Sequence, residues 1–150
     1  MRKLTVVLRY LLDTNLVSEP TKPAASPAVL QALAQHEVGC TTSAPTLEQL
    51  TFGCARLPAG ARQAWLQRWL AGLVSCITVL PFDQQAAIWL GQERARLALA
   101  GRPVPRTDGE IAAVAVVQGL TLVTRNSSDF AAFKGLLVVD WQVPAPPSPA

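Results

Sequence analysis

The stretch YLLDTNLVSEP, residues 10–20, decides how the chain begins to fold. Its first residues are apolar and typical of a buried strand, and Asp13, Thr14 and Asn15 follow at once. Asp and Asn are common where strands end in turns, and Asp is also a common helix N-cap. On these residues alone, Asp13 fits equally well as a turn or cap residue and as one wall of an active site.

Outward from this stretch, short strand-like runs alternate with helical patterns. Ser26 is placed as an N-cap with Pro27 at the first helical position. The segment 109–120 is apolar on nearly every side, which predicts a helix buried all round. Strands alternating with helices predict an α/β fold with a mainly parallel sheet. We expect strands at 9–13, 39–43, 76–81, 121–125 and 136–140, and helices at 26–37, 44–57, 61–73, 82–101, 109–120 and 127–133.

Length and composition favour one well-buried domain. The chain has 150 residues, of which 50% are hydrophobic and 15% are charged. Residues 1–142 are expected to form that domain. The tail VPAPPSPA, residues 143–150, is expected to be extended and poorly ordered, because proline cannot pair in a sheet. The net charge of +3 is compatible with a polyanionic partner without demanding one.

The start of the chain and its cysteines bear on location. No apolar run approaches the ~20 residues that a membrane helix needs. Arg9 and Asp13 interrupt the apolar start, and no small-residue cleavage site follows, so a cytoplasmic location is expected. The three widely spaced cysteines suggest reduced core thiols more than disulfides or a zinc site.

Acidic residues gather where an α/β fold binds ligands, outside the carboxyl ends of its strands. Spacing places Asp108 three and four residues before apolar positions of its helix, and Glu48 in the same relation to Thr51 and Phe52. Both acids are therefore expected to lean toward partly buried surface, where an unpaired carboxylate needs a cation. Acids without a His/Cys set suit Mg²⁺ or Mn²⁺. Topology alone does not choose among the six acids at such positions, which are Asp13, Glu48, Asp83, Asp108, Asp129 and Asp140.

Each acid also has a purely structural interpretation. Asp108 lies within TDGE, which matches a capping box formed by Thr107 and Glu110. Glu48 fits an ordinary surface acid of a helix, and Asp129 fits a first-turn acid of a helix capped by Ser127 or Ser128. The single histidine, His36, and the helical pair Trp65 and Trp69 are better read as packing residues than as catalytic or base-stacking ones.

Four segments in order resemble PIN-domain ribonucleases, and most of all the VapC toxins of bacterial VapBC toxin–antitoxin pairs. The segments are YLLDTNLVSEP (10–20), APTLEQLTFG (44–53), GRPVPRTDGEIAAVA (101–115) and LVTRNSSDF (122–130). The resemblance covers about residues 9–141. The chain differs from the family in that eight residues precede Arg9, whereas the family reaches its Asp-Thr-Asn motif sooner. Either the first strand is longer here or the start codon is assigned too early.

The resemblance implies a three-layer α/β sandwich with about five strands and helices on both faces. It also implies a ribonuclease whose acidic pocket binds Mg²⁺ or Mn²⁺ and hydrolyses RNA phosphodiesters. The family pattern carries its acids onto Asp13, Glu48 and Asp108. The fourth position is filled by Asp129 or by Asn126; we assign Asp129, with Asn126 as a polar neighbour.

The same resemblance implies supporting roles and partners. Thr14, Asn15 and Thr124 would hold the pocket by hydrogen bonds. Arg125 would contact RNA phosphate or, equally well, form an ion pair with a neighbouring acid. A VapB-type antitoxin would cover the site, and a homodimer is usual for the family. Asp83 and Asp140 match no catalytic position.

Two other functions compete with this interpretation. A catalytically silent PIN domain would act as an RNA- or protein-binding module, and intact acids at the matched positions argue against it. A phosphatase-type domain would use Asp13 as a nucleophile, but such sites usually have Asp-x-Asp, and residue 15 is Asn. RNA turnover with Mg²⁺ or Mn²⁺ separates the leading interpretation from the silent module, and a phosphoryl-aspartate trapping assay separates it from the phosphatase.

Overall fold

A five-stranded sheet forms the middle of the computed structural model, which describes residues 7–142. The strand order is β3-β2-β1-β4-β5, and every neighbouring pair is parallel, so the prediction of a mainly parallel sheet is confirmed. The strands are β1 (Tyr10–Leu12), β2 (Cys40–Ser43), β3 (Thr78–Leu80), β4 (Thr121–Val123) and β5 (Val138–Val139).

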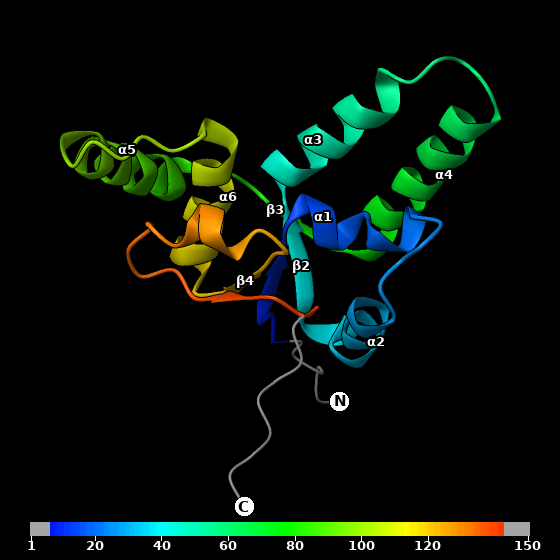
Figure 1. Ribbon diagram of the computed structural model, residues 1–150, viewed down its shortest axis with the longest axis horizontal. Coiled ribbons are helices and arrows are strands. Elements are labelled where there is room, and N and C mark those ends of the chain that lie inside the picture. Colours follow the sequence, from blue (N-terminus) through cyan, green and yellow to red (C-terminus); the bar gives the residue numbers. More distant parts are fainter. Residues whose placement is uncertain (1–6, 143–150) are drawn as a thin grey trace, which may run out of the picture.

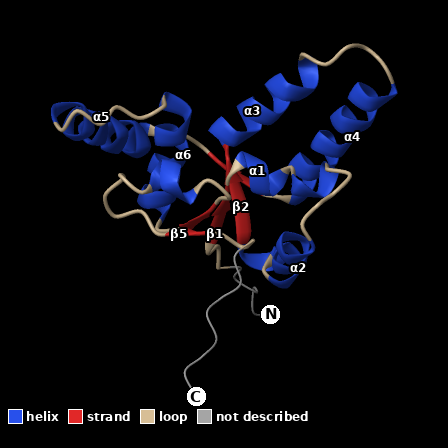
Figure 2. Cartoon of the chain, viewed as in Figure 1, coloured by secondary structure: helices blue, strands red, loops and turns tan. Residues whose placement is uncertain are grey.

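Alternation along β1 sorts the helices into two layers. Successive strand residues point to opposite faces of a sheet. Leu11 belongs to a core cluster built with α5 and α6, whereas Leu12 belongs to a second cluster built with α1 to α4. Figures 1 and 2 show the two helical layers on either side of the strands, as the three-layer prediction requires. The helices are α1 (Thr14–Val17), α2 (Pro27–Gln35), α3 (Ala44–Ala55), α4 (Ala61–Cys76), α5 (Gln84–Leu99) and α6 (Arg106–Gln118).

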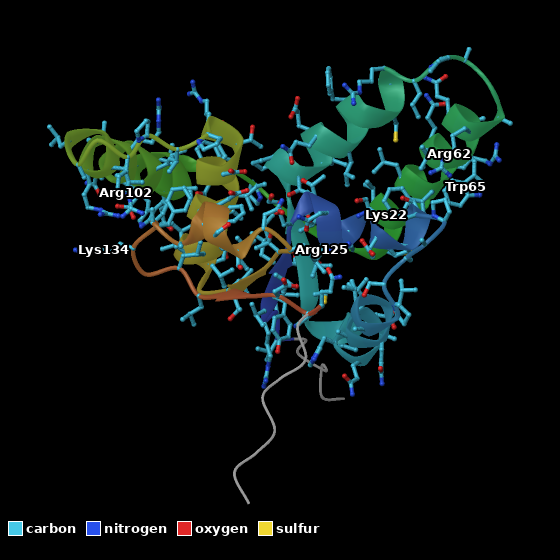
Figure 3. The ribbon with its side chains drawn as sticks, in the orientation of Figure 1. Lys22, Arg62, Trp65, Arg102, Arg125 and Lys134 are labelled. Atoms are coloured by element: carbon cyan, nitrogen blue, oxygen red, sulfur yellow. The ribbon has the colours of Figure 1, made fainter. Side chains whose placement is uncertain are left out.

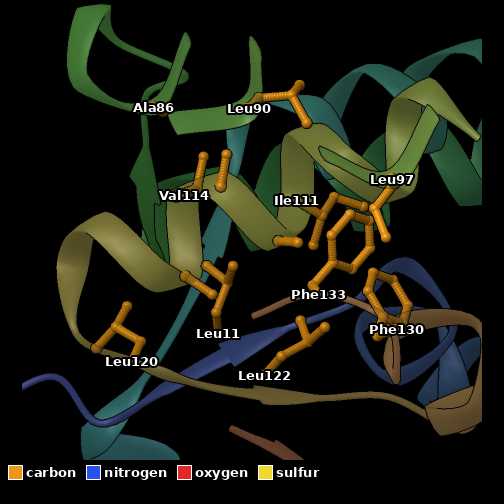
Figure 4. Close-up of a cluster of buried hydrophobic side chains, with 13 residues drawn as sticks. Leu11, Ala86, Leu90, Leu97, Ile111, Val114, Leu120, Leu122, Phe130 and Phe133 are labelled. Carbon is orange, nitrogen blue, oxygen red and sulfur yellow. The ribbon is translucent and has the colours of Figure 1, made fainter. Parts of the chain in front are cut away.

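The α6 helix is the most buried helix of the fold. Its residues from Ile111 to Ala115 are all buried (Figure 4), which confirms the predicted buried helix, although it begins at Arg106. Gly109 lets α6 approach α5, because a Cβ atom there would lie 2.6 Å from Leu90 Cδ1. Gly119 ends the helix with a φ of 67°, a left-handed conformation that favours glycine.

Aromatic and cysteine residues mostly take packing roles. The His36 ring lies 5.0 Å from the Tyr10 ring and 5.1 Å from the Trp141 ring, so its interpretation as a packing residue is supported. Trp69 packs against the second core cluster, whereas Trp65 is 43% exposed, so of the expected core or interface packing only the interface remains for Trp65, as a prediction. The cysteines are free; Cys54 is buried, Cys40 is half-buried and Cys76 is exposed, contrary to the expectation of three core thiols.

Short helical turns are the elements that the sequence patterns missed or overstated. The α1 helix was not expected, nor were the 3₁₀ turns η1 (Glu19–Thr21) and η2 (Glu37–Gly39). The helix expected at 127–133 is only the 3₁₀ turn η3 (Ser127–Phe130). Four residues or fewer give too weak a periodicity to be recognised.

Some expectations concern the ends of the chain. Within the described residues the first strand starts at Tyr10, so it does not take the longer form that the extra residues suggested. The prediction for the tail 143–150 lies outside the described residues, as do residues 1–6. Between residues 7 and 142, no helix has both the length and the apolar character needed to cross a membrane.

The chain changes direction across the sheet between β3 and β4. The order β1, β2, β3 runs toward one edge, and α5 and α6 then return the chain to β4 on the other side of β1. Such a reversal leaves a crevice at the carboxyl ends of the two strands involved, where open α/β sheets bind their ligands. Here the crevice lies between β1 and β4.

Candidate active site

A cleft of about 650 Å³ opens at this reversal point. It lies between α1, α3 and the start of α6, with the end of β1 at its base. Three of the predicted acids line it together, as does one of the two candidates for the fourth position. Its lining residues are Asp13, Thr14, Asn15, Ser18, Lys22, Glu48, Gln49, Phe52, Gly53, Arg56, Thr107, Asp108 and Asn126.

Asp13 is the buried acid of the cleft, with 7% of its surface exposed. One carboxylate oxygen accepts a hydrogen bond from the Thr14 amide at 2.7 Å, and the other accepts one from Thr124 Oγ1 at 2.8 Å. Burial raises the pKa of the Asp13 carboxyl, these hydrogen bonds oppose the rise, and the charge of Asp129 adds to it. Asp13 therefore both caps α1 and presents a desolvated carboxylate at the cleft.

Asp108 lies half-buried in the first turn of α6, facing the same cleft. Burial raises its pKa, and the negative charges of Asp13 and Asp129 raise it further. The capping-box interpretation is wrong, because the N-cap is Pro105 and Glu110 instead pairs with Arg106 at 3.4 Å. Asp108 is a first-turn acid, and the negative charges of two neighbouring carboxylates act on it.

Glu48 comes to the cleft on α3. Ser43 ends β2 and caps this helix by accepting a hydrogen bond from the Thr46 amide at 3.3 Å. Glu48 is exposed, so the expectation that it leans toward partly buried surface is wrong. The neighbours that suggested it, Thr51 and Phe52, are themselves exposed, and no apolar face lies there.

The two candidates for the fourth position occupy different places. Asn126 lines the main cleft, whereas Asp129 lines an adjoining hollow of about 270 Å³ that shares Asp108 with it. Both side chains are exposed. Asp129 is nevertheless close enough for its charge to raise the pKa values of Asp13 and Asp108. Asp129 thus acts on the cleft electrostatically without lining it.

Strand order separates the remaining two of the six acids from the cleft. Asp83 follows β3 and Asp140 follows β5, and these are the two edge strands. Asp83 caps α5 by accepting a hydrogen bond from the Ala86 amide at 3.0 Å. Asp140 accepts one from the Gln142 amide at 2.9 Å. Both acids have local structural partners, and neither lines the cleft.

A hydrogen-bond network joins the polar residues around Asp13. Thr124 Oγ1 donates to Asp13 and accepts from the Asn126 amide at 3.0 Å. Asn15 Oδ1 accepts from the Arg125 amide at 3.3 Å. Thr14 Oγ1 donates to the side chain of Gln49 on α3. These bonds tie α1 both to the loop after β4 and to α3, which fixes the position of Asp13.

Arg125 points to a neighbouring acid. Its Nη1 atom lies 3.0 and 3.2 Å from the two carboxylate oxygens of Glu19, so the ion pair, one of its two interpretations, is present. Lys22 Nζ also pairs with Glu19, at 2.9 Å. Figure 3 labels both cations, which come from different segments of the chain.

Several lining residues were missed by the sequence analysis. Phe52 and Arg56 follow Glu48 at intervals of four residues, a spacing that puts all three on one face of a helix, so this pair could have been found. Lys22 lies in an irregular segment after η1, and no pattern in the sequence points to it. The two cations Lys22 and Arg56 give the acidic cleft a mixed charge.

The chemistry of the donor set fits a hard divalent cation. The cleft offers carboxylate and amide oxygens with neither His nor Cys among its lining residues. Within residues 7–142, none of the four predicted acids forms an ion pair, and no group of three or more His, Cys, Asp or Glu side chains is already gathered around one point. Mg²⁺ commonly uses only one or two protein carboxylates and keeps several waters, so this arrangement suits it.

Comparison with known proteins identifies relatives along most of the chain. The chain is 37% identical to "VapC ribonuclease Y4jK" of Sinorhizobium fredii, over 88% of this chain and 97% of that protein. It is 35% identical to "tRNA(fMet)-specific endonuclease VapC" of Shigella flexneri, over 90% and 99%. "Toxin FitB" of Neisseria gonorrhoeae is 34% identical over 80% and 89%. No protein-family model matches the chain.

Superposition with solved structures shows the same likeness. FitAcB from Neisseria gonorrhoeae superposes with a TM-score of 0.81 and 31% identity, covering 88% of this chain and 97% of that one. DNA-bound VapBC from Salmonella typhimurium superposes with a TM-score of 0.78 and 31% identity, covering 90% and 99%. The likeness therefore extends over the whole sheet and both helical layers.

Proposed function

Because the chain belongs to the VapC family of ribonucleases, the toxin components of toxin–antitoxin systems, we propose that it hydrolyses RNA phosphodiesters with Mg²⁺ or Mn²⁺ held in the acidic cleft. The single observation that carries the proposal is that Asp13, Glu48 and Asp108 line one cleft, and that within residues 7–142 none of them pairs with a protein cation. The two desolvated carboxylates, those of Asp13 and Asp108, need an external cation in that state.

The acids take different parts in holding the ion. Asp13 and Asp108 would be its principal ligands, because both line the cleft and are the more desolvated acids. Glu48 would approach from α3. Asp129 would act through its charge from the adjoining hollow, and Asn126 would hydrogen-bond within the cleft.

The bound ion would lower the pKa of a water molecule and offset charge on the scissile phosphate. This chain's residues prepare the site for it. The Thr124 hydroxyl and the Thr14 amide orient the Asp13 carboxylate, and Thr14 fixes α1 against α3 through Gln49. Lys22 and Arg56 stand at the same cleft and would attract the RNA backbone, so affinity should fall as salt rises.

Arg125 has two roles in the proposal. Its ion pair with Glu19 fixes the loop after β4, while 29% of its side chain stays exposed. That exposed part is predicted to contact an RNA phosphate. The principal function of the residue is the ion pair.

A partner chain completes the proposed function. The similar solved structures are the complexes FitAcB and DNA-bound VapBC. By that likeness, this chain would be inhibited by a VapB-type antitoxin whose segment covers the cleft, and it would form a homodimer. Action on RNA under such control implies a cytoplasmic protein.

Cleavage by the purified protein tests the proposal. Single-stranded RNA should be cut with Mg²⁺ or Mn²⁺, and EDTA should stop the reaction. Asp13→Asn should not cut RNA although its circular dichroism spectrum matches that of the wild type. Cleavage that persists in EDTA, or in Asp13→Asn at the wild-type rate, would contradict the proposal.

A further inference from the structure

An exposed phenylalanine stands among the charged residues of the cleft. Phe52 lies on α3 and is 60% exposed, and it lines the same cleft as Glu48 and Asp108. Phe52 belongs to neither core cluster. An aromatic ring left open to water inside a binding cleft is typical of contact with a ligand.

A cation lies over the ring. The guanidinium carbon of Arg56 is 5.5 Å from the centroid of the Phe52 ring, within cation–π distance. Arg56 is the C-cap residue of α3, one helical turn after Phe52, and both residues line the cleft. The contact orients the ring, and the exposed part of the ring stays free for a second planar group.

Gly53, the residue after Phe52, leaves open space at the cleft. It lines the cleft as well, and apart from its chain neighbours and the backbone of its own helix, no atom of residues 7–142 lies within 4 Å of where its Cβ atom would be. Glycine within a helix is less favourable than alanine, so packing does not explain its presence there. The absence of a side chain at Gly53 therefore leaves more of the cleft open to a ligand.

Helical spacing puts the ring near the proposed chemistry. Glu48 and Phe52 are four residues apart, so they lie one turn, or about 6 Å, from each other along the same face of α3. A planar group on Phe52 would therefore neighbour the phosphate at the acids. Lys22 and Arg56, at the same cleft, suit a polyanionic backbone.

We propose that Phe52, oriented by Arg56, is a platform on which one unpaired base of the RNA substrate stacks beside the phosphate that is cut. The inference rests on the proposed ribonuclease function. Aromatic stacking accepts every base, so the platform selects single-stranded RNA and not a particular sequence. Bases inside an RNA duplex are already stacked on one another and cannot occupy it.

Binding measurements on uncleaved RNA test the platform. In Asp108→Asn protein with Mg²⁺, the probe is a fluorescein-labelled single-stranded RNA of ten nucleotides and mixed sequence. Adding Phe52→Leu should weaken its affinity about 5- to 150-fold, which is the stacking contribution of one base. Phe52→Trp should keep the affinity. An abasic RNA of the same length should bind Phe52→Leu and the parent equally.

A matched aromatic pair elsewhere provides the control. Arg62 lies over the Trp65 ring at 5.3 Å, and both are on α4 but do not line the cleft (Figure 3). Trp65→Leu should leave the affinity for both RNAs unchanged. Gly53→Ala should keep the thermal midpoint or raise it, yet weaken binding of the base-bearing RNA only.

The outcomes separate this inference from the function on which it rests. Equal losses on base-bearing and abasic RNA, no loss for Phe52→Leu, or an equal loss for Trp65→Leu would each overturn the platform. Unchanged RNA affinity with lost inhibition by the antitoxin would assign the ring to protein recognition instead. Because these readouts need no cleavage, a failure of the nuclease proposal would appear only in the cleavage assay.

Discussion

Two sets of desolvated carboxylates in this molecule have pKa values that are shifted in opposite directions. In the cleft, burial and like charges raise the pKa values of Asp13 and Asp108. In the body of the fold, Glu19 and Glu93 are 1% and 6% exposed, and their pKa values are lowered, that of Glu19 to about 2. The difference lies in their partners.

Glu19 and Glu93 are satisfied by the protein itself. Glu19 accepts hydrogen bonds from Lys22 at 2.9 Å, from the Ser26 amide at 2.8 Å and from Arg125. Glu93 pairs with Arg96 and accepts the Lys134 amide at 2.6 Å. Such carboxylates stabilise the fold. Within residues 7–142 neither Asp13 nor Asp108 pairs with a protein cation, and their charges repel each other, so a bound metal ion would relieve this repulsion.

The largest expected difference between the two sets is in catalysis. Asp13→Asn and Asp108→Asn should each lower RNA cleavage with Mg²⁺ by about a hundredfold or more, because an electrostatic element of the transition state is lost. Glu19→Gln should cleave at a rate within a few fold of wild type per folded molecule. Single-turnover assays at 25 °C measure this, and equal losses in both sets would break the comparison.

For the free energy of unfolding, the larger loss is expected for Glu19 and not for the cleft acids. Glu19→Gln should lower the free energy of unfolding by about 1–3 kcal/mol at pH 7, since charge-assisted hydrogen bonds are lost. Glu19 has a folded pKa below its ordinary 4.5, so its contribution is present above pH 4.5 and is lost as the pH falls toward about 2. Urea unfolding at pH 7 and pH 2.5 should therefore show a smaller difference from wild type at the lower pH. A difference that does not shrink would contradict this assignment.

The smallest effect is expected for stability at the cleft. Asp108→Asn removes a charge that Asp13 and Asp129 repel, but it also loses a favourable interaction with the start of α6. Without metal, the free energy of unfolding should stay the same or rise by up to about 1 kcal/mol. A loss larger than that in thermal or urea unfolding would mean that Asp108 is a structural acid.

Sequence patterns predicted most of the fold because its strands and long helices have strong local signals. The order of the strands was not predictable, since it depends on which strands pair after the chain turns back at β4. Six acids therefore stayed equivalent until the family pattern, and then the position of β1 between β2 and β4, distinguished them. The capping of α2 by Ser26 could be predicted because it depends only on neighbours along the chain.

The errors about the site have the same origin. The exposure of Glu48 was misjudged because Phe52 was assumed to mark an apolar face, whereas it faces the cleft. The burial of Glu19 depends on Arg125, which is 106 residues away along the chain, so no local pattern reveals it. Long-range pairing decides whether an acid is structural or available for a ligand.

Calorimetric titration with Mn²⁺ tests the central claim most directly, namely that the cleft carboxylates, which pair with no cation of residues 7–142, receive a metal ion. Wild type and Glu19→Gln should bind Mn²⁺ with similar affinity, while Asp108→Asn should bind at least about tenfold more weakly, a change of about 1.4 kcal/mol. Equal binding by wild type and Asp108→Asn, or a loss of binding confined to Glu19→Gln, would contradict the account.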